Sequence, residues 1–147
     1  MATGTFDVRT KIWTGDVNGY KYPLDIYLGE KLLEALDEVP ERVIQINHEE
    51  GTELTCSELK MSSIRVAQNL QRLGIRSDDV IGFICRNSGN LASLIFGCAL
   101  IGAPVNPLHV SFSKENIKYM FGQTRPKLVF CDHDLFDTTK EALFETK

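Results

Sequence analysis

The stretch Val80-Ile81-Gly82-Phe83-Ile84-Cys85 decides the fold class of this sequence. All six residues are apolar or glycine, so a strand made from them would have no face suited to water. Strands that are apolar on both faces are typical of parallel sheets covered by helices on each side. The stretch therefore predicts a buried, parallel strand that opens at Asp79.

A long amphipathic helix is predicted just before this strand. Thr55-Cys56-Ser57-Glu58 matches a capping box, in which the threonine hydroxyl and the glutamate carboxylate each accept the other residue's backbone N–H. Gly74 can end the helix in the left-handed conformation and place Ile75 against Leu70, as in a Schellman motif. Along this helix Leu59, Ser63, Val66, Leu70 and Leu73 repeat at helical spacing.

Helices and strands continue to alternate after the central strand. We expect helices over about residues 90–101 and 114–123 and from Asp134 onward, with a short buried strand at Val105 and another at 128–131. The expected helix caps are Asn87 or Ser88, Ser113 and Asp134. Alternation of this kind predicts an α/β fold with mostly parallel strands and right-handed crossovers.

The first third of the chain has a different organisation. Residues 29–38 are expected to form a helix with an apolar face, and residues 42–47 and 53–54 a hairpin. Residues 1–27 are interrupted by glycine and proline and are expected to form an irregular N-terminal arm. Three residues could anchor this arm to something larger: Ile12, Trp13 and Tyr20. We therefore divide the chain into an arm, 1–27, and a partial α/β domain, 28–147.

Composition indicates a folded protein and restricts its partners. Apolar residues make up 43% of the chain and charged residues 24%, and the net charge of −4 argues against nucleic acid or an anionic membrane as the main partner. No secretory signal opens the sequence. The longest apolar stretch, 91–105, is broken by glycine and proline and is too short to span a bilayer. We therefore expect an intracellular protein without a transmembrane segment.

The four cysteines support the same compartment. Cys56, Cys85, Cys98 and Cys131 form no CxxC pair, and no histidine lies at zinc-finger spacing from them. Three of them lie in apolar runs, where cysteine behaves as a small hydrophobic residue. We expect reduced, largely buried thiols, as in a reducing compartment.

A search for catalytic motifs identifies none, so we assign no catalytic, cofactor-binding or metal-ligating residue. Neither GxxxxGK[ST] nor GxGxxG occurs. The nearest candidate anion site is the turn at 86–90 between the central strand and the next helix, where free N–H groups would face the carboxyl edge of the sheet. Asn87 and Ser88 could equally be helix caps. Asn106-Pro107 could line a pocket or form a turn.

The remaining titratable candidates are scattered. His48, His109 and His133 all fall in expected loops, and the carboxylate pairs Glu49-Glu50 and Asp78-Asp79 lie at turns. Catalytic or metal-binding groups need partners held in fixed geometry. These residues are therefore expected to be solvated.

Several segments in register resemble the N-terminal part of the adenylate-forming superfamily, which includes acyl-CoA synthetases, coumarate-CoA-ligase-like enzymes and beetle luciferases. The resemblance covers most of residues 26–132. It is carried by Gly29-Glu30, 54–59, Leu73-Gly74-Ile75, 79–83, Asn87-Ser88, 99–103, Asn106-Pro107 and 126–130.

The resemblance implies a function for a full-length relative. Such a protein would use ATP, Mg²⁺ and coenzyme A to convert a carboxylic acid, expected to be a fatty acid, into an acyl-adenylate and then an acyl-CoA. Insect luciferase-like members suggest that the protein is located in peroxisomes. The family's phosphate loop with its lysine, its Mg²⁺-binding acid, its ribose-binding aspartate and its C-terminal lysine have no counterpart in these 147 residues. We therefore expect a truncated chain that binds none of these cofactors and is inactive alone.

Two other functions are compatible with the sequence. The chain could be a short non-catalytic product that pairs with a full-length relative, or that holds a ligand without turning it over. For the truncated enzyme and for the short non-catalytic product alike, the expected partner is the remainder of the domain or a full-length relative. An unrelated flavodoxin-like domain is the third possibility, but the phosphate-binding loop expected after its first strand is not found.

Overall fold

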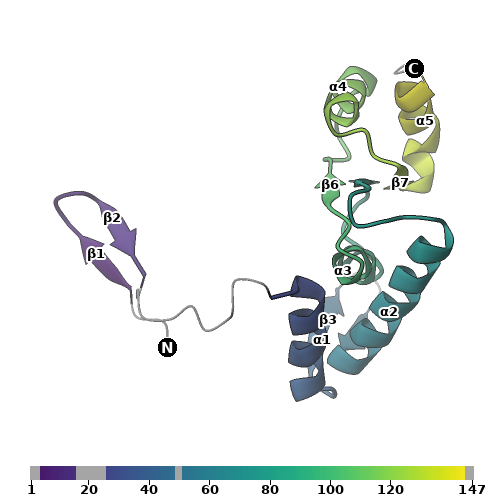
Figure 1. Ribbon diagram of the computed structural model, residues 1–147. Coiled ribbons are helices and arrows are strands. Elements are labelled where there is room, and N and C mark those ends of the chain that lie inside the picture. Colours follow the sequence, from purple (N-terminus) through teal and green to yellow (C-terminus); the bar gives the residue numbers. More distant parts are fainter. Residues whose placement is uncertain (1–3, 16–25, 49–50, 145–147) are drawn as a thin grey trace.

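The computed structural model describes residues 4–15, 26–48 and 51–144, and it confirms the α/β fold class (Figure 1). The predicted features that lie outside these ranges are Tyr20, the Glu49-Glu50 pair and the last three residues. The helices are α1 (Leu28–Glu38), α2 (Cys56–Arg72), α3 (Leu91–Leu100), α4 (Lys114–Thr124), the short 3₁₀ helix η1 (His133–Leu135) and α5 (Phe136–Phe144). The strands are β1 (Thr5–Asp7), β2 (Ile12–Thr14), β3 (Val43–Asn47), β4 (Thr52–Thr55), β5 (Ile81–Ile84), β6 (Val105–Pro107) and β7 (Leu128–Cys131).

The central feature is a three-stranded parallel sheet with the order β6-β5-β7. All four residues of β5 are buried, as the apolar stretch predicts. On one face of the sheet, Phe83 packs with core residues of α2 and α3, including Leu70 and Cys98. On the other face, Ile84 packs with residues of α4 and α5, including Phe121. The sheet is therefore covered by helices on both sides, which explains why β5 needs no polar residue.

The expectation of a buried strand at Val105 is wrong. β6 is the outer strand beside β5, and the Val105 side chain is 38% exposed. Residues 106–107 belong to this strand rather than to a turn, and the Asn106 side chain donates a hydrogen bond to Thr124 at 2.7 Å.

Helix α2 begins and ends as its sequence predicts. Thr55 Oγ1 accepts the N–H of Glu58 at 3.2 Å, and the Glu58 carboxylate accepts the N–H of Thr55 at 2.9 Å. At the other end Gly74 has φ +79°, and the N–H of Ile75 donates to the carbonyl of Leu70 at 3.0 Å. Both ends use contacts between residues only three to five positions apart, so local sequence specifies them.

The caps predicted for two other helices are wrong. Asn90, and not Asn87 or Ser88, precedes α3, and its side chain makes no capping hydrogen bond. Asp134 lies inside η1 instead of capping the last helix. Ser113 does cap α4, accepting the N–H of Asn116 at 3.3 Å.

The N-terminal arm contains ordered structure that the sequence did not predict. Strands β1 and β2 form an antiparallel hairpin, which Figure 1 shows standing apart from the rest of the described chain. The Asp7 carboxylate accepts the N–H groups of Arg9 and Thr10, and Lys11 takes the left-handed conformation at φ +60°. Glycine is the usual residue where the backbone is left-handed, so a lysine at this position gives no sequence signal for the turn. The predicted hairpin of β3 and β4 is confirmed.

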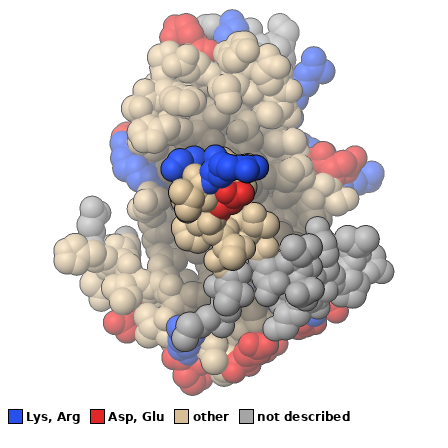
Figure 2. Space-filling view, turned by 90° about the vertical axis from the view of Figure 1, so that its left-hand side faces the viewer, with Lys and Arg blue, Asp and Glu red and all other residues tan. Residues whose placement is uncertain are grey.

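Charged side chains on the face shown in Figure 2 lie in small separate groups. Lys and Arg atoms form a short row across the middle of this face, next to Asp or Glu atoms, and separate groups elsewhere. Within the described ranges, no helix is both long enough and apolar enough to cross a membrane.

All four cysteines are free thiols, as predicted; Cys56 and Cys98 are buried, and Cys85 and Cys131 are half-buried. Burial raises the pKa of the Cys98 thiol to about 11. Because the thiolate is the reactive form, we expect Cys98 to resist iodoacetamide at pH 8 in the folded chain and to react fully in urea.

The raised pKa of Cys98 also gives the chain a defined pH dependence. A group whose pKa is higher in the folded state contributes its full stability below the unfolded pKa and loses it as pH rises towards the folded value. Thermal melts should therefore show a loss of stability above about pH 9 that is reduced in Cys98→Ala. Alkylation of Cys98 as fast in the native chain as in urea would contradict the burial and the raised pKa of this thiol.

Candidate functional site

The carboxyl edge of the parallel sheet brings together three loops, which follow β5, β6 and β7. In open α/β sheets ligands bind in the crevice beyond this edge. Residues 86–90 follow β5, residues 108–111 follow β6, and residues 132–134 follow β7. Any ligand site within the described sheet is expected there.

Arg86 holds two of these loops together. Its guanidinium lies 2.8 Å from Asp132 and 2.8–2.9 Å from both carboxylate oxygens of Asp134. Asp132 also accepts the backbone N–H of Arg86 at 3.0 Å. The guanidinium hydrogen bonds lower the pKa of Asp134 below its ordinary value and raise that of Arg86. Because Asp132 and Asp134 both pair with the guanidinium, Arg86 does not support the candidate anion site at 86–90.

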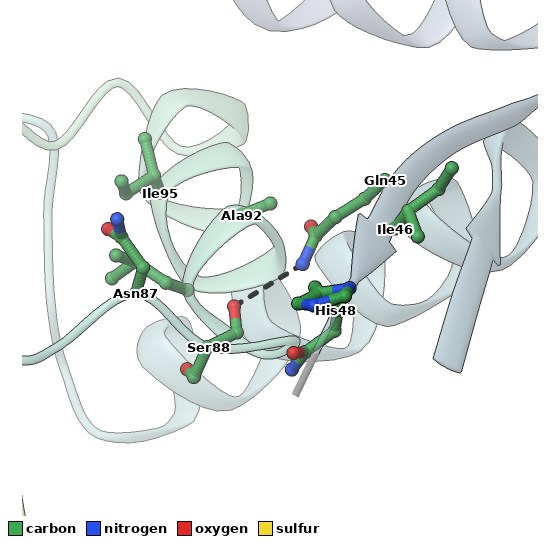
Figure 3. Close-up of a pocket in the computed structure, with 9 residues that line it drawn as sticks. Gln45, Ile46, His48, Asn87, Ser88, Ala92 and Ile95 are labelled. Atoms are coloured by element: carbon green, nitrogen blue, oxygen red, sulfur yellow. Dashed lines mark hydrogen bonds between the residues drawn. The ribbon is translucent and has the colours of Figure 1, made fainter. Parts of the chain in front are cut away.

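A pocket adjoins the same loop on its other side. It lies between the end of β3 and the beginning of α3, and a hydrogen bond of 3.4 Å from the Gln45 amide to the Ser88 carbonyl crosses it. Figure 3 shows Gln45 of β3 and His48, the residue after this strand, directed towards Ser88. The apolar lining residues are Ile46, Leu91, Ala92 and Ile95, and the polar ones are Gln45, Asn47, His48, Asn87 and Ser88.

The chemistry of this pocket is that of a neutral binding surface. Its polar groups are amides, a hydroxyl and an imidazole, and none of the lining residues is an aspartate, glutamate, lysine or arginine. Phosphate groups need cations or several converging N–H groups to offset their charge. The lining residues include no lysine or arginine, so this pocket does not fit ATP with Mg²⁺, and we derive no step of a reaction through these groups.

The other predicted candidates do not assemble into a site. His48, His109 and His133 are exposed, as predicted. His109 Nδ1 lies 2.7 Å from the Ser111 hydroxyl, within the loop after β6. Among the described residues, no group of three His, Cys, Asp or Glu side chains could hold a metal ion.

Asp79, one member of the Asp78-Asp79 pair, has a structural role. Asp79 was expected to be a solvated turn residue, but it accepts a hydrogen bond from Lys127 at 2.7 Å and another from the Arg76 N–H at 2.8 Å. The bond from Lys127 lowers the pKa of Asp79. Lys127 also donates to the carbonyl of Gly74 at 2.9 Å, so this cluster joins the end of α2 to the start of β7.

The two partners of Arg86 are not predicted from the sequence. Asp132 was not singled out, and Asp134 was assigned to a helix cap. A signal was available, since both follow a strand predicted to be parallel to β5, and the carboxyl ends of parallel strands meet at one edge of a sheet.

We expect Arg86→Gln to raise the pKa of Asp134 towards its ordinary value. A carboxylate whose pKa is lowered in the folded state contributes stability above its unfolded pKa and loses it as pH falls through the folded value. The variant should therefore lose less stability than wild type between pH 5 and pH 2. NMR titration of the Asp134 side chain and melts across this range measure both effects.

Arg9→Gln is the matched control, because it removes the same charge from the β1–β2 hairpin. It should leave the Asp134 titration unchanged. An Asp134 pKa that is the same in Arg86→Gln as in wild type would show that the ion pair does not persist in solution.

Comparison with known proteins identifies the domain. A family model described as "AMP-binding enzyme" matches residues 32–147. The acyl-CoA ligase sidI of Aspergillus fumigatus is 30% identical over 107 residues, which is 73% of this chain and 18% of that protein. A medium/long-chain-fatty-acid–CoA/3-oxocholest-4-en-26-oate–CoA ligase of Mycolicibacterium smegmatis is 31% identical over 87 residues, which is 59% of this chain and 15% of that protein.

Solved structures agree with the family match. The luciferase-like enzyme from the nonluminescent Zophobas morio mealworm superposes with a TM-score of 0.79 and 30% identity, covering 85% of this chain and 30% of that one. The chain thus spans less than a third of these relatives. It belongs to the AMP-binding enzyme family and corresponds to the N-terminal part of an adenylate-forming protein.

Proposed function

We propose that the protein to which these residues contribute activates a fatty acid. In this reaction the carboxylate attacks the α-phosphorus of ATP, pyrophosphate leaves, and the thiol of coenzyme A then displaces AMP from the acyl group. The family match over residues 32–147 is the observation that carries the proposal. Relatives named as a medium/long-chain-fatty-acid–CoA ligase and as palmitoyl-CoA ligase FUM16 of Gibberella moniliformis support the choice of a fatty acid.

The contribution of this chain to such an enzyme is structural. It supplies the β6-β5-β7 sheet and the helices that cover both faces. The described residues at the carboxyl edge present Arg86 already paired and a pocket lined by neutral groups. We therefore propose that Mg²⁺, ATP and coenzyme A are bound by other parts of the enzyme, and that the 147-residue chain is inactive alone.

ATP–pyrophosphate exchange with fatty acids of eight to sixteen carbons tests both statements. The purified chain should give no exchange above the rate without enzyme. The native polypeptide, purified from its source with an antibody against residues 26–48, should exchange with at least one acid and form its acyl-CoA. Exchange by the isolated chain would disprove its inactivity. A polypeptide several times longer than the chain but inert towards every carboxylic acid would disprove the proposed reaction.

A role in fatty acid metabolism within peroxisomes follows as part of the same proposal. Its support is the similarity to a luciferase-like insect enzyme. Immunofluorescence with the same antibody should coincide with a peroxisomal membrane marker. Diffuse staining would refute the proposed peroxisomal location.

A non-catalytic chain that pairs with a full-length relative is the second candidate. The favouring observation is that the described sheet has only three strands, so its outer strands have edges available for pairing. Co-purification of a full-length relative with the chain would support this candidate, and a monomeric chain in cell extract would count against it.

A further inference from the structure

We propose that the β1–β2 hairpin docks the protein on an anionic phospholipid membrane, with its tip in the head-group region. The tip is defined as residues 8–11, which join the two strands. The proposal does not rest on the proposed function, because the hairpin lies ahead of residues 32–147, which match the AMP-binding family. It is inferred from exposed apolar side chains, from the charges at the tip and from the position of the hairpin.

The hairpin carries apolar side chains that the described chain leaves exposed. Trp13 is 71% exposed and Val8 is 69% exposed, and Ile12 and Phe6 are exposed as well. Phe6 lies opposite Trp13 across the two strands, with ring centroids 5.1 Å apart, so these two rings share one face. Exposed apolar side chains that cluster in this way mark interaction surfaces.

A hairpin of this size needs a partner surface. Each strand has only three residues, and an isolated two-stranded hairpin is marginally stable at best in water. Figure 1 shows β1 and β2 standing apart from the other elements, so the described chain does not provide that surface. The same position leaves the tip free to approach a large partner such as a bilayer.

The tip is basic. Arg9 and Lys11 are both exposed, and Asp7 is the single acidic residue of the hairpin, 5–14. The Asp7 carboxylate accepts the backbone N–H of Arg9 at 2.8 Å and that of Thr10 at 3.2 Å, so it serves the turn itself. Two cations against one carboxylate at the end of the hairpin favour an anionic partner.

A bilayer surface fits both the apolar groups and the charges. Tryptophan is enriched at membrane interfaces because its ring is apolar on one side and carries an N–H, and lysine and arginine are attracted to anionic head groups. Apolar side chains occupy one face at Phe6 and Trp13, the other face at Ile12, and the tip at Val8. A flat protein surface would cover one face only, whereas a membrane interface surrounds the tip.

The same features limit the depth and the strength of the contact. Backbone N–H and C=O groups on the outer edges of a two-stranded hairpin need water or head groups, so the hairpin cannot enter the hydrocarbon core. The net charge of the whole chain is −4, which disfavours a broad contact with an anionic surface and confines the contact to the hairpin. Binding should therefore be reversible and should weaken as salt screens the charges.

Trp13 provides the test, because it is the one tryptophan in the sequence. The chain is mixed with vesicles of two parts phosphatidylcholine to one part phosphatidylserine. The fluorescence of Trp13 should shift to shorter wavelength, and lipids brominated near the head group should quench it more than lipids brominated near the chain end. Vesicles of phosphatidylcholine alone should bind at least about tenfold more weakly, because they lack the charge that attracts the tip.

Paired variants separate the hairpin from the rest of the chain. Each basic residue near an anionic surface favours binding roughly fivefold, so Arg9→Gln with Lys11→Gln should weaken binding at least about tenfold. Arg65→Gln with Arg72→Gln is the matched control, because it removes the same charge from exposed positions of α2, and it should not weaken binding. Melting temperatures should stay close to that of wild type in both double variants.

A second pair tests the apolar contact. Val8→Ser removes an apolar side chain from the tip and should weaken binding severalfold, since interfacial affinity grows with the apolar area that is buried. Val39→Ser makes the same change at an exposed residue after α1 and should have no effect. The native polypeptide, purified with the antibody against residues 26–48, should float with the same vesicles in a density gradient.

Several outcomes would overturn the proposal. An unchanged Trp13 emission with vesicles, or equal losses in the hairpin variants and their controls, would show that the hairpin does not contact lipid. A shift of Trp13 emission that needs only a higher protein concentration would assign the hairpin to a second copy of the chain. A native polypeptide that does not float would show that other parts of the enzyme cover the hairpin. None of these readouts involves adenylation, so a failure of pyrophosphate exchange would refute the proposed function without refuting the membrane contact.

Discussion

Replacing Phe83 by alanine is expected to lower the free energy of unfolding by about 3–5 kcal/mol, the usual cost of removing a buried phenylalanine side chain. Phe83 is only 2% exposed, and its ring stacks on Phe130 of β7 with centroids 5.5 Å apart. It also packs against residues of α2 and α3, so its loss opens a cavity between the sheet and both helices. Urea denaturation followed by circular dichroism measures the effect.

The size of this effect decides whether the variant folds at all. Domains are stable by only about 5–15 kcal/mol, so the loss would consume much of the total. Phe136→Ala is the matched control, because Phe136 is 52% exposed and the same atoms are removed. It should cost less than about 1 kcal/mol, as surface changes usually do. Equal losses in the two variants would mean that Phe83 does not lie between the layers in solution.

The elements predicted correctly are those that local sequence specifies. The apolar run at 80–85 predicted β5, and the capping box and Gly74 predicted both ends of α2. In each case the interacting groups are a few residues apart, or the signal is the absence of any polar face. Such signals do not depend on where the rest of the chain lies.

The errors concern arrangements that depend on strand order. Val105 lies in an apolar run, and nothing in that run shows that β6 would be an outer strand. The pairing of Arg86 with Asp132 and Asp134 spans 46 and 48 residues. It exists because β7 lies directly beside β5 in the sheet, although β6 comes between them in the sequence. The assignment of Asp134 to a helix cap failed for the same reason, since the ion pair with Arg86 competes for its carboxylate.

The candidate site was predicted less well than the fold. From the sequence, the turn at 86–90 is the nearest candidate for an anion site, and the structure places a pocket beside Asn87 and Ser88. The other wall of that pocket comes from the end of β3, about 40 residues earlier. No local pattern links Gln45 with Ser88, so the sequence alone does not predict that these residues line one pocket of polar, uncharged groups.

Replacing Gly97 by alanine is expected to destabilise the chain by about 1–3 kcal/mol, the usual cost of overpacking a core. Gly97 is buried in α3 where that helix packs against α2. A Cβ atom there would lie 2.4 Å from Val66 Cγ1, 2.7 Å from Val66 Cβ and 3.1 Å from the Ser63 carbonyl. Alanine favours a helix by about 1 kcal/mol over glycine, so any loss shows that the clash outweighs propensity.

Val66→Ala supplies the test of this cause, because it removes the methyl groups that the new Cβ would meet. In the Val66→Ala background, Gly97→Ala should cost less than half as much as in wild type, which gives a favourable coupling energy of more than about 0.5–1.5 kcal/mol. Gly15→Ala, with no atom within 4 Å of its Cβ position, should change stability by less than about 0.5 kcal/mol. Additive losses in the double variant would show that α2 and α3 do not approach at Gly97. The predicted requirement for a small residue at this position would then be wrong.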